Sequence, residues 1–254
     1  MVKHYAILLL VALLVGGCSL GKPQIDMAQS HYKMAQSNMV TKDYTSALNE
    51  MLQAVQIKPD NPDYQATLAM VYFEKQAYPL AEQHYKKSLQ LRPNDPIVEN
   101  NLAALYMNMQ RWDEAALLFR KVADNLLFRY KTRALIGLGV SLSHGGKNMQ
   151  AVLAYNEVLQ NFPDNTTALF LLGQIYYAMG TYDLAQQRLG KVLKLMPDNS
   201  NARLLLGQCY MQLGQLEAAA GEFREVANRE DGSELATTAR EYLQVVTSGY
   251  LNAS

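Results

Sequence analysis

Apolar and polar positions follow the period of a helix along most of this chain, in short blocks separated by turn signals. Within residues 166–199, one block runs through Leu169, Leu172 and Ile175 at spacings of three and breaks at Gly180. A second block of the same kind follows, and a proline stops it. The pattern predicts a unit of helix, turn, helix and stop. Neither helix can bury its apolar stripe alone, so the unit needs copies of itself on both sides.

The same unit recurs along the chain. First helices repeat a leucine, a small residue and then an aromatic residue, as in Leu68, Ala69 and Tyr72. Second helices carry a small residue where paired backbones approach closely. It stands at steps of 34, 34, 36, 34 and 34 residues, at Ala47, Ala81, Ala115, Ala151, Ala185 and Ala219. One match would mean little, but six in register indicate a repeat array.

This pattern resembles the tetratricopeptide repeat, a helix pair of about 34 residues with a Leu-Gly pair, a tyrosine, an alanine and a terminal proline. The resemblance implies an all-α fold, a right-handed superhelical solenoid of six tetratricopeptide repeats with a C-terminal capping helix. Residues 28–233 would form the repeats and residues 234–254 the capping helix and tail. The expected repeats are 28–61, 62–95, 96–131, 132–165, 166–199 and 200–233. Such a fold says little about function.

The first residues of the chain do not follow the repeat pattern. Residues 1–17 combine Lys3 with a run of ten apolar residues, too short to span a membrane and typical of a signal peptide. The run ends in Val-Gly-Gly followed by Cys18, which resembles a bacterial lipobox. That resemblance implies cleavage between Gly17 and Cys18 and acylation of Cys18, with residues 18–27 as the lipidated cysteine and a tether. The alternative is an uncleaved signal anchor with an incidental cysteine.

Several acyl chains on one residue anchor a protein stably to a membrane. By resemblance to enterobacterial lipoproteins, an aspartate after the cysteine would indicate retention at the inner membrane. Ser19 stands there instead. We therefore expect attachment to the outer membrane of a Gram-negative bacterium, facing the periplasm, with the inner membrane as the alternative.

Composition narrows the functional classes. The formal net charge is zero, with 23 basic and 23 acidic residues, which argues against a nucleic-acid partner. No metal-ligand spacing, cofactor motif or catalytic constellation is present, so we expect no metal, no cofactor and no enzymatic activity. Ser143 and His144 are adjacent, but no acid is placed to orient the histidine. Cys209 is expected to be a small buried hydrophobe, with a reactive thiol as the alternative.

First helices line the concave wall of such a solenoid. By resemblance to the family, repeat positions 2, 5, 9 and 12 face this groove. They are Tyr32, Met39, Met70, Phe73, Asn100, Met107, Ile136, Val140, Phe170, Gln174, Tyr177, Leu204, Gln208 and Met211. The set is mostly apolar, lacks the lysines of family members that clamp a peptide carboxylate, and suits an amphipathic helix. The alternative is that the register is off by one and these are core residues.

The period breaks once, at the two extra residues near 126–133. This segment is expected to continue a helix whose apolar residues pack inward. The alternative is a kink that exposes a second partner-binding surface. Trp112 lies just before the second helix of the third repeat and is expected to pack the turn between helices. The alternative is a ligand platform.

The lipobox, short tether and six repeats resemble the layout of pilotins, outer-membrane lipoproteins that help the type IV pilus secretin reach the membrane and multimerise. This resemblance implies a scaffold whose groove holds a protein or peptide segment, for instance of a secretin subunit. The alternative is a repeat lipoprotein that acts as an adaptor for outer-membrane protein assembly, cell-wall enzymes or polysaccharide export.

Overall fold

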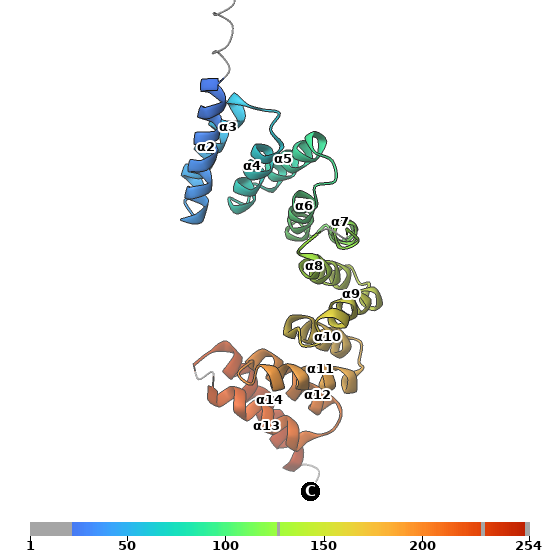
Figure 1. Cartoon of the computed structure of the whole chain (residues 1–254). Coiled ribbons are helices and arrows are strands. Elements are labelled where there is room, and N and C mark those ends of the chain that lie inside the picture. Colours follow the sequence, from blue (N-terminus) through green and yellow to red (C-terminus); the bar gives the residue numbers. More distant parts are fainter. Residues whose placement is uncertain (1–21, 126–127, 230–231, 252–254) are drawn as a thin grey trace, which may run out of the picture. The chain divides into compact units, whose positions relative to one another are not determined.

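The computed structural model describes residues 22–125, 128–229 and 232–251. Within these ranges the chain forms thirteen α-helices and no strand (Figure 1). The helices are α2 (Lys22–Val40), α3 (Tyr44–Ile57), α4 (Pro62–Glu74), α5 (Tyr78–Leu91), α6 (Pro96–Asn108), α7 (Trp112–Ala123), α8 (Lys131–His144), α9 (Asn148–Asn161), α10 (Thr166–Ala178), α11 (Tyr182–Leu195), α12 (Ser200–Gln212), α13 (Leu216–Arg229) and α14 (Glu234–Leu251). Even-numbered helices from α2 to α12 are the first helices of the expected repeats.

Local sequence sets where the first helices begin. At the start of α4, α6, α10 and α12 the side-chain oxygen of the capping residue accepts backbone N–H bonds of the first turn. The capping residues are Asn61, Asp95, Asn165 and Asn199 respectively. This satisfies donors that a helix start leaves without partners. In α4 and α6 a proline follows the cap, where its missing N–H carries no penalty.

The turn after each first helix has one residue in the left-handed conformation. It recurs in register at Lys42, Gln76, Gln110, Gly146, Gly180 and Gly214. After α10, the Gly180 N–H donates to the Tyr177 carbonyl at 3.0 Å and the Thr181 N–H to the Tyr176 carbonyl at 2.9 Å. These two bonds close the helix and reverse the chain into α11.

The helix pairs bury the residues that mark the repeat. All six marker alanines are 0% exposed. Four residues after each alanine stands a large side chain that is also buried, at Met51, Tyr85, Phe119, Tyr155, Leu189 and Phe223. The sequence pattern therefore identifies the interface between paired helices, and the prediction of a tetratricopeptide-repeat solenoid is confirmed at this level.

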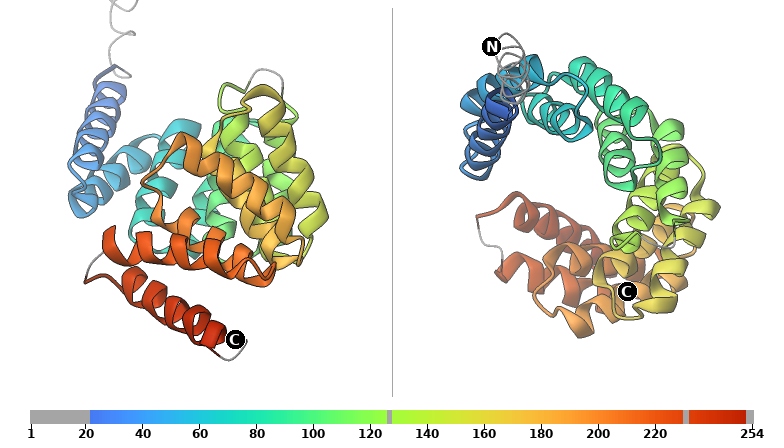
Figure 2. Two further views of the ribbon diagram at one scale, coloured as in Figure 1. Left: turned by 90° about the horizontal axis from the view of Figure 1, so that it is seen from below. Right: turned by 45° about the horizontal axis from the view of Figure 1, so that its top comes forward.

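The chain divides into two compact units, one up to Arg111 and one from Trp112 onward, so the division falls between α6 and α7. In the first unit each helix from α2 to α6 packs against the next. In the second, α7 to α13 do the same, and α14 lies alongside α13 (Figures 1 and 2). The Tyr242 ring of α14 stacks on the Phe223 ring of α13 at 5.1 Å, covering the apolar face of the last repeat.

The two ends of the array are more helical than the sequence pattern indicates. Helix α2 begins at Lys22 and so includes residues 22–27, which were expected to belong to the tether. Pro23 permits this because it lies in the first turn, where no intrahelical N–H bond is required. Helix α14 continues to Leu251, so it takes up most of the segment 234–254 that was expected to hold a capping helix and a tail. Its extension includes Thr247, whose hydroxyl donates to the Leu243 carbonyl at 2.8 Å.

The segment with the two extra residues does not continue a helix, so that prediction is wrong. Helix α7 ends at Ala123 and α8 begins at Lys131. Between them Phe128 is buried, whereas Tyr130 is exposed and holds its ring edge-on to Phe128 at 5.8 Å. Leu126 and Leu127 lie outside the described residues. Two added residues shift a helical stripe by about 200°, so a continuous helix would lose the register of the next repeat.

Candidate functional site

All fourteen expected groove residues lie on first helices. They are Tyr32 and Met39 on α2, Met70 and Phe73 on α4, Asn100 and Met107 on α6, Ile136 and Val140 on α8, Phe170, Gln174 and Tyr177 on α10, and Leu204, Gln208 and Met211 on α12. None of them is fully buried. Six belong to the first unit and eight to the second.

In the first unit, several expected groove residues already have partners within the fold. The Tyr32 ring packs on the Tyr64 ring at 4.9 Å, and the Phe73 ring on the Tyr78 ring at 5.9 Å. Met70 is the most open apolar side chain of the set, at 37% exposed. The side-chain oxygen of Asn100 is buried and has no hydrogen-bond partner among the described residues. This face therefore offers an apolar contact at Met70, whereas the Asn100 acceptor is buried.

In the second unit, Val140 and Gln174 are brought together. They line the same pocket, of about 300 Å³, between α8 and α10. Ser143 and His144, at the C-terminal end of α8, border it as well. Phe170, Tyr177, Leu204 and Met211 pack against core clusters with part of their surface still accessible.

Trp112 contacts the turn of the following repeat. Its ring stacks on His144 at 4.6 Å with an interplanar angle of 17°. The expected packing role at a turn therefore holds, although the turn is the one after α8. His144 is occupied by this contact at the rim of the pocket.

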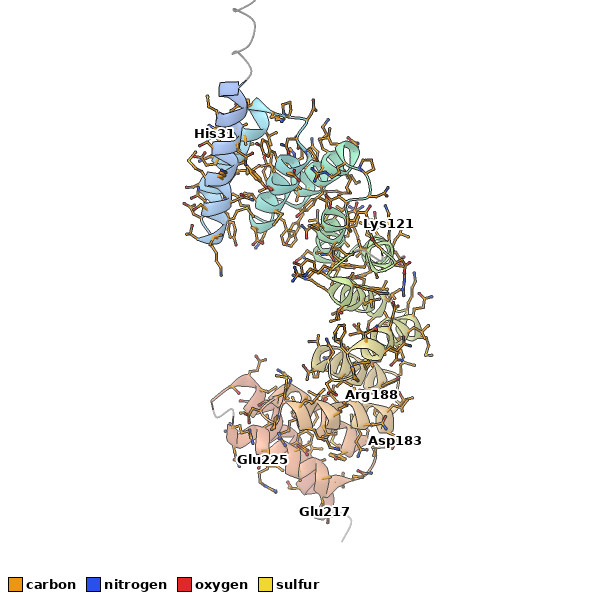
Figure 3. All side chains as sticks on the ribbon, in the orientation of Figure 1. His31, Lys121, Asp183, Arg188, Glu217 and Glu225 are labelled. Carbon is orange, nitrogen blue, oxygen red and sulfur yellow. The ribbon has the colours of Figure 1, made fainter. Side chains whose placement is uncertain are left out.

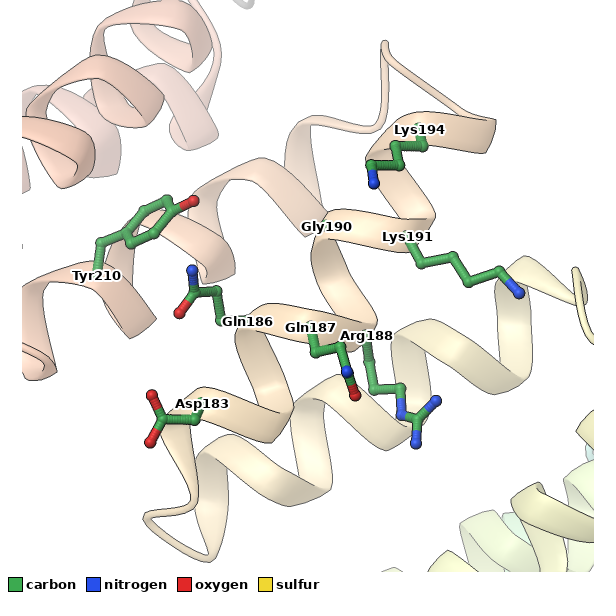
Figure 4. A pocket seen from close by; sticks show the side chains of 8 residues that line it. All are labelled: Asp183, Gln186, Gln187, Arg188, Gly190, Lys191, Lys194 and Tyr210. Atoms are coloured by element: carbon green, nitrogen blue, oxygen red, sulfur yellow. The ribbon is translucent and has the colours of Figure 1, made fainter.

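A second depression lies on the second helix of repeat five, away from the expected groove positions (Figure 4). It has a volume of about 770 Å³, is lined mainly by α11 side chains and reaches Tyr210 of α12. Gly190 opens it, since a β-carbon there would touch nothing within 4 Å. The sequence alone could have indicated this depression, because the other repeats have larger residues where repeat five has Gly190. These residues are Leu52, Lys86, Arg120, Asn156 and Arg224.

A polar pair recurs across the interface of several helix pairs and was not foreseen. His31 contacts Glu50 at 2.6 Å, and His84 contacts Gln65 at 2.7 Å. Arg203 donates to Glu222 at 2.7 Å. In each case the two residues stand 19 apart at the same repeat positions. The sequence carries this pattern, because the paired polar residues recur at equivalent repeat positions.

Repeat five departs from this arrangement. Arg188 occupies the second-helix position of the pair, but the first-helix position is Leu169. The Nε atom of Arg188 is buried without a hydrogen-bond partner among the described residues. Figure 3 shows Arg188 on α11 and His31 on α2. Arg188 borders the depression together with Lys191, which is paired with Asp164 at 2.8 Å.

Chemistry-bearing side chains are scattered. Among the described residues, no group of three or more His, Cys, Asp or Glu side chains is arranged to hold a metal ion. Cys209 is a buried free cysteine, and burial raises the pKa of its thiol to about 11. The small-hydrophobe interpretation of Cys209 therefore holds.

Gly17 and Cys18 lie outside the described residues, and within those residues no helix has the length and apolar character needed to cross a membrane.

Family models described as tetratricopeptide repeat match the sequence over residues 32–96, 100–124, 136–185 and 177–241. Together with the recurring helix pairs, these matches show that the chain belongs to the tetratricopeptide-repeat proteins. The comparison with curated protein sequences finds no match.

Several solved structures share the fold. PilW, described as a widely conserved type IV pilus biogenesis factor, matches with a TM-score of 0.73 and 19% identity, over 83% of this chain and 97% of that chain. PilF of Pseudomonas aeruginosa matches with a TM-score of 0.70 and 18% identity, over 87% and 99%. YrrB, a repeat protein with an unusual peptide-binding site, matches with a TM-score of 0.61 and 17% identity, over 75% and 97%. At these identities the likeness concerns the fold.

Proposed function

We propose that this protein is a membrane-anchored protein-binding scaffold that assists the outer-membrane localisation and assembly of the type IV pilus secretin. The observation that carries the proposal is a combination. A lipobox-like start ending at Cys18 precedes a repeat array that matches PilW and PilF over nearly their whole lengths. PilW is a type IV pilus biogenesis factor, which supports a role in the same process.

In this proposal Cys18 is acylated and holds the repeats at the outer membrane, on the periplasmic side. Multiple acyl chains would give stable anchoring, where one chain is marginal. The partner segment binds the first-helix faces, where apolar side chains such as Met70 remain open. Burying apolar surface there would contribute about 25 cal/mol per Å².

The anchor is tested by replacing Cys18. In the Cys18→Ser variant the protein should lose acyl labelling and leave the outer-membrane fraction of a density gradient. Continued membrane association of this variant without acyl chains would favour the uncleaved signal anchor instead.

The partner is tested by pull-down from detergent-solubilised membranes with the full lipoprotein. The groove variant carries Met70→Glu and Met107→Glu, and the matched control carries Met149→Glu, an exposed methionine (63%) on the second helix α9. We expect secretin to co-purify with the parent and the control and to be lost with the groove variant.

Other outcomes separate the parts of the proposal. Secretin bound equally by all three proteins would leave the pilus role standing and move the binding surface elsewhere. Recovery of another assembly factor in place of secretin would favour the adaptor alternative. Absence of secretin from the parent sample would overturn the secretin role.

A further inference from the structure

The pocket between α8 and α10 has a tyrosine, Tyr155, at its floor. Tyr155 of α9 reaches it from beneath and is only 1% exposed. Tyr155 lines the pocket, and no hydrogen bond connects its hydroxyl to another described residue. Burial raises the pKa of Tyr155, so the hydroxyl stays protonated at neutral pH. The floor therefore presents a fixed hydrogen-bonding group without a partner.

Two more polar groups converge on the same cavity. Ser143 and Gln174 both border it, and the side chain of neither forms a hydrogen bond with another described residue. Gln174 is exposed and marks the mouth, whereas Ile175 is buried and lies deeper. A polar group that has no partner in the protein can form a hydrogen bond with a ligand that enters the pocket.

The remaining walls are apolar. Val140 comes from α8, and Leu171 and Ile175 come from α10. The volume of about 300 Å³ is at the lower end for small-molecule sites. It therefore suits one side chain better than a cofactor or a longer segment. On one side the rim is held in place by His144, whose ring is stacked on Trp112.

We propose that this pocket holds one tyrosine side chain of a partner segment, with its ring between Val140, Leu171 and Ile175 and its hydroxyl bonded to Tyr155 and Gln174. An aromatic body with a polar tip matches apolar walls above a polar floor. The assignment rests on the proposed function only in that the bound molecule is a protein. It assigns a preference for tyrosine over phenylalanine to this position.

The test uses N-acetyl-tyrosinamide as the probe and Trp112 as the reporter. Trp112 is the single tryptophan of the chain, so its indole N–H gives one resonance in an NMR spectrum of the labelled full-length protein. Because Trp112 stacks on a residue at the rim, we expect the probe to shift this resonance saturably in the millimolar range. N-acetyl-phenylalaninamide should bind about 2- to 10-fold more weakly, since it lacks one hydrogen bond.

Tyr155→Phe removes the floor hydroxyl and keeps the ring. It should weaken tyrosinamide binding about 2- to 10-fold and leave phenylalaninamide binding unchanged. Tyr85→Phe is the matched control, because Tyr85 occupies the same repeat position in the first unit and is also buried. It should leave both affinities unchanged. If Tyr155→Phe fails to fold, Gln174→Ala and the mouth-filling Ala178→Phe test the same contacts at exposed positions.

Equal binding of both probes, unchanged binding in Tyr155→Phe, or no saturable shift would each overturn the tyrosine site. The tyrosine site would also be overturned if the protein self-associates and the probe dissociates the oligomer, because a second copy of the chain would then occupy the pocket. These results leave the secretin pull-down unaffected, and loss of secretin binding leaves the probe titration unaffected. The two proposals therefore fail separately.

Discussion

Gly139 of α8 lies directly against the ring of Tyr155 of α9. A β-carbon on Gly139 would stand only 2.5 Å from Cζ of that ring. Gly173 and Gly207 face Leu189 and Phe223 in the same way, at 2.8 and 2.6 Å. The first three repeats carry alanine at the equivalent position, at Ala35, Ala69 and Ala103. The pairs α8–α9, α10–α11 and α12–α13 are thus each closed by a glycine on one helix under a large side chain on the other.

This relationship predicts the effect of a single methyl group. Gly139→Ala should lower the free energy of unfolding by up to about 2 kcal/mol, because overpacking outweighs the gain in helix propensity. Gly190→Ala is the control, since a β-carbon there meets nothing within 4 Å. It should be neutral or stabilising by up to about 1 kcal/mol. Urea unfolding followed by circular dichroism measures both, and equal stability of the two variants would contradict the close contact.

The turn residues with positive φ give a second prediction. Gln76 adopts φ 59° and Gly180 φ 73° at equivalent positions. A side chain is disfavoured there and glycine is not, so Gln76→Gly should raise the free energy of unfolding by about 0.5 to 1 kcal/mol. Gly180→Gln should lower it by a similar amount.

The control for the turn is a helical glycine. Gly221→Gln in α13 introduces the same side chain where a β-carbon has open space and φ is ordinary. It should stabilise the protein, with the opposite sign to Gly180→Gln. The same sign for both variants would mean that turn conformation does not set these energies.

The helix pairs were predictable because their signals are local. Asn61 caps α4 and Pro62 follows it, and the buried alanines recur at fixed steps. The left-handed turns at Lys42, Gln76 and Gln110 were not predictable, because no glycine marks them. The neighbouring helices and the closing hydrogen bonds impose that conformation.

The candidate sites were only partly predictable. The resemblance to the repeat family placed Val140 and Gln174 on the groove face, and the structure adds that they share one pocket. The free hydroxyl of Tyr155 escaped detection, because the tyrosine reads as a core residue at its repeat position. Whether this hydroxyl has a partner depends on side chains that α8, α9 and α10 bring together only in the folded protein. The depression opened by Gly190 likewise depends on a missing side chain.

The Arg203–Glu222 pair gives a third prediction. The two side chains are mostly buried, with exposures of 16% and 21%. Glu222→Ala leaves the Arg203 charge without this acceptor and should lower the free energy of unfolding by about 1 to 3 kcal/mol. Repeat four holds Leu135 and Ala154 at the same two positions.

The chain therefore supplies its own replacement for the pair. The double variant Arg203→Leu and Glu222→Ala copies repeat four and should recover most of the lost stability, because it removes both charges. A double variant no more stable than Glu222→Ala would show that the pair acts through packing and not through charge. Urea unfolding of the parent, of the single variants Arg203→Leu and Glu222→Ala, and of the double variant gives the coupling energy.

Cys209 gives a fourth prediction. Its thiol is buried, and its pKa is raised to about 11, so thiolate is scarce at neutral pH. The folded protein should react with a thiol-specific chromogenic reagent only as fast as the helix pair opens, and urea should restore rapid reaction. Rapid stoichiometric reaction of the folded Cys18→Ser variant would revive the reactive-thiol alternative.

Glu82 gives the last prediction, on acid stability. It accepts hydrogen bonds from Tyr106 at 3.1 Å and from Arg111 at 2.7 Å, and it pairs with Lys86 at 2.7 Å. Burial acts to raise the pKa of Glu82, but the hydrogen bonds from Lys86, Arg111 and Tyr106 outweigh it and hold the pKa below its ordinary value. A carboxylate whose pKa is lower in the folded state stabilises the fold above its unfolded pKa of about 4.3.

That stabilisation must be lost as the pH falls through the folded pKa of Glu82, because the folded protein then takes up the proton as well. Glu82→Gln should therefore be less stable than the parent at neutral pH, and the difference should shrink below about pH 4. Asp60→Asn is the control in the same unit. The Asp60 side chain is 78% exposed, and its oxygen lies 3.9 Å from Lys87 Nζ, which makes a long ion pair. An exposed pair contributes little, so this variant should follow the parent at both pH values. A difference for Glu82→Gln that stays constant with pH would assign its effect to geometry and not to charge.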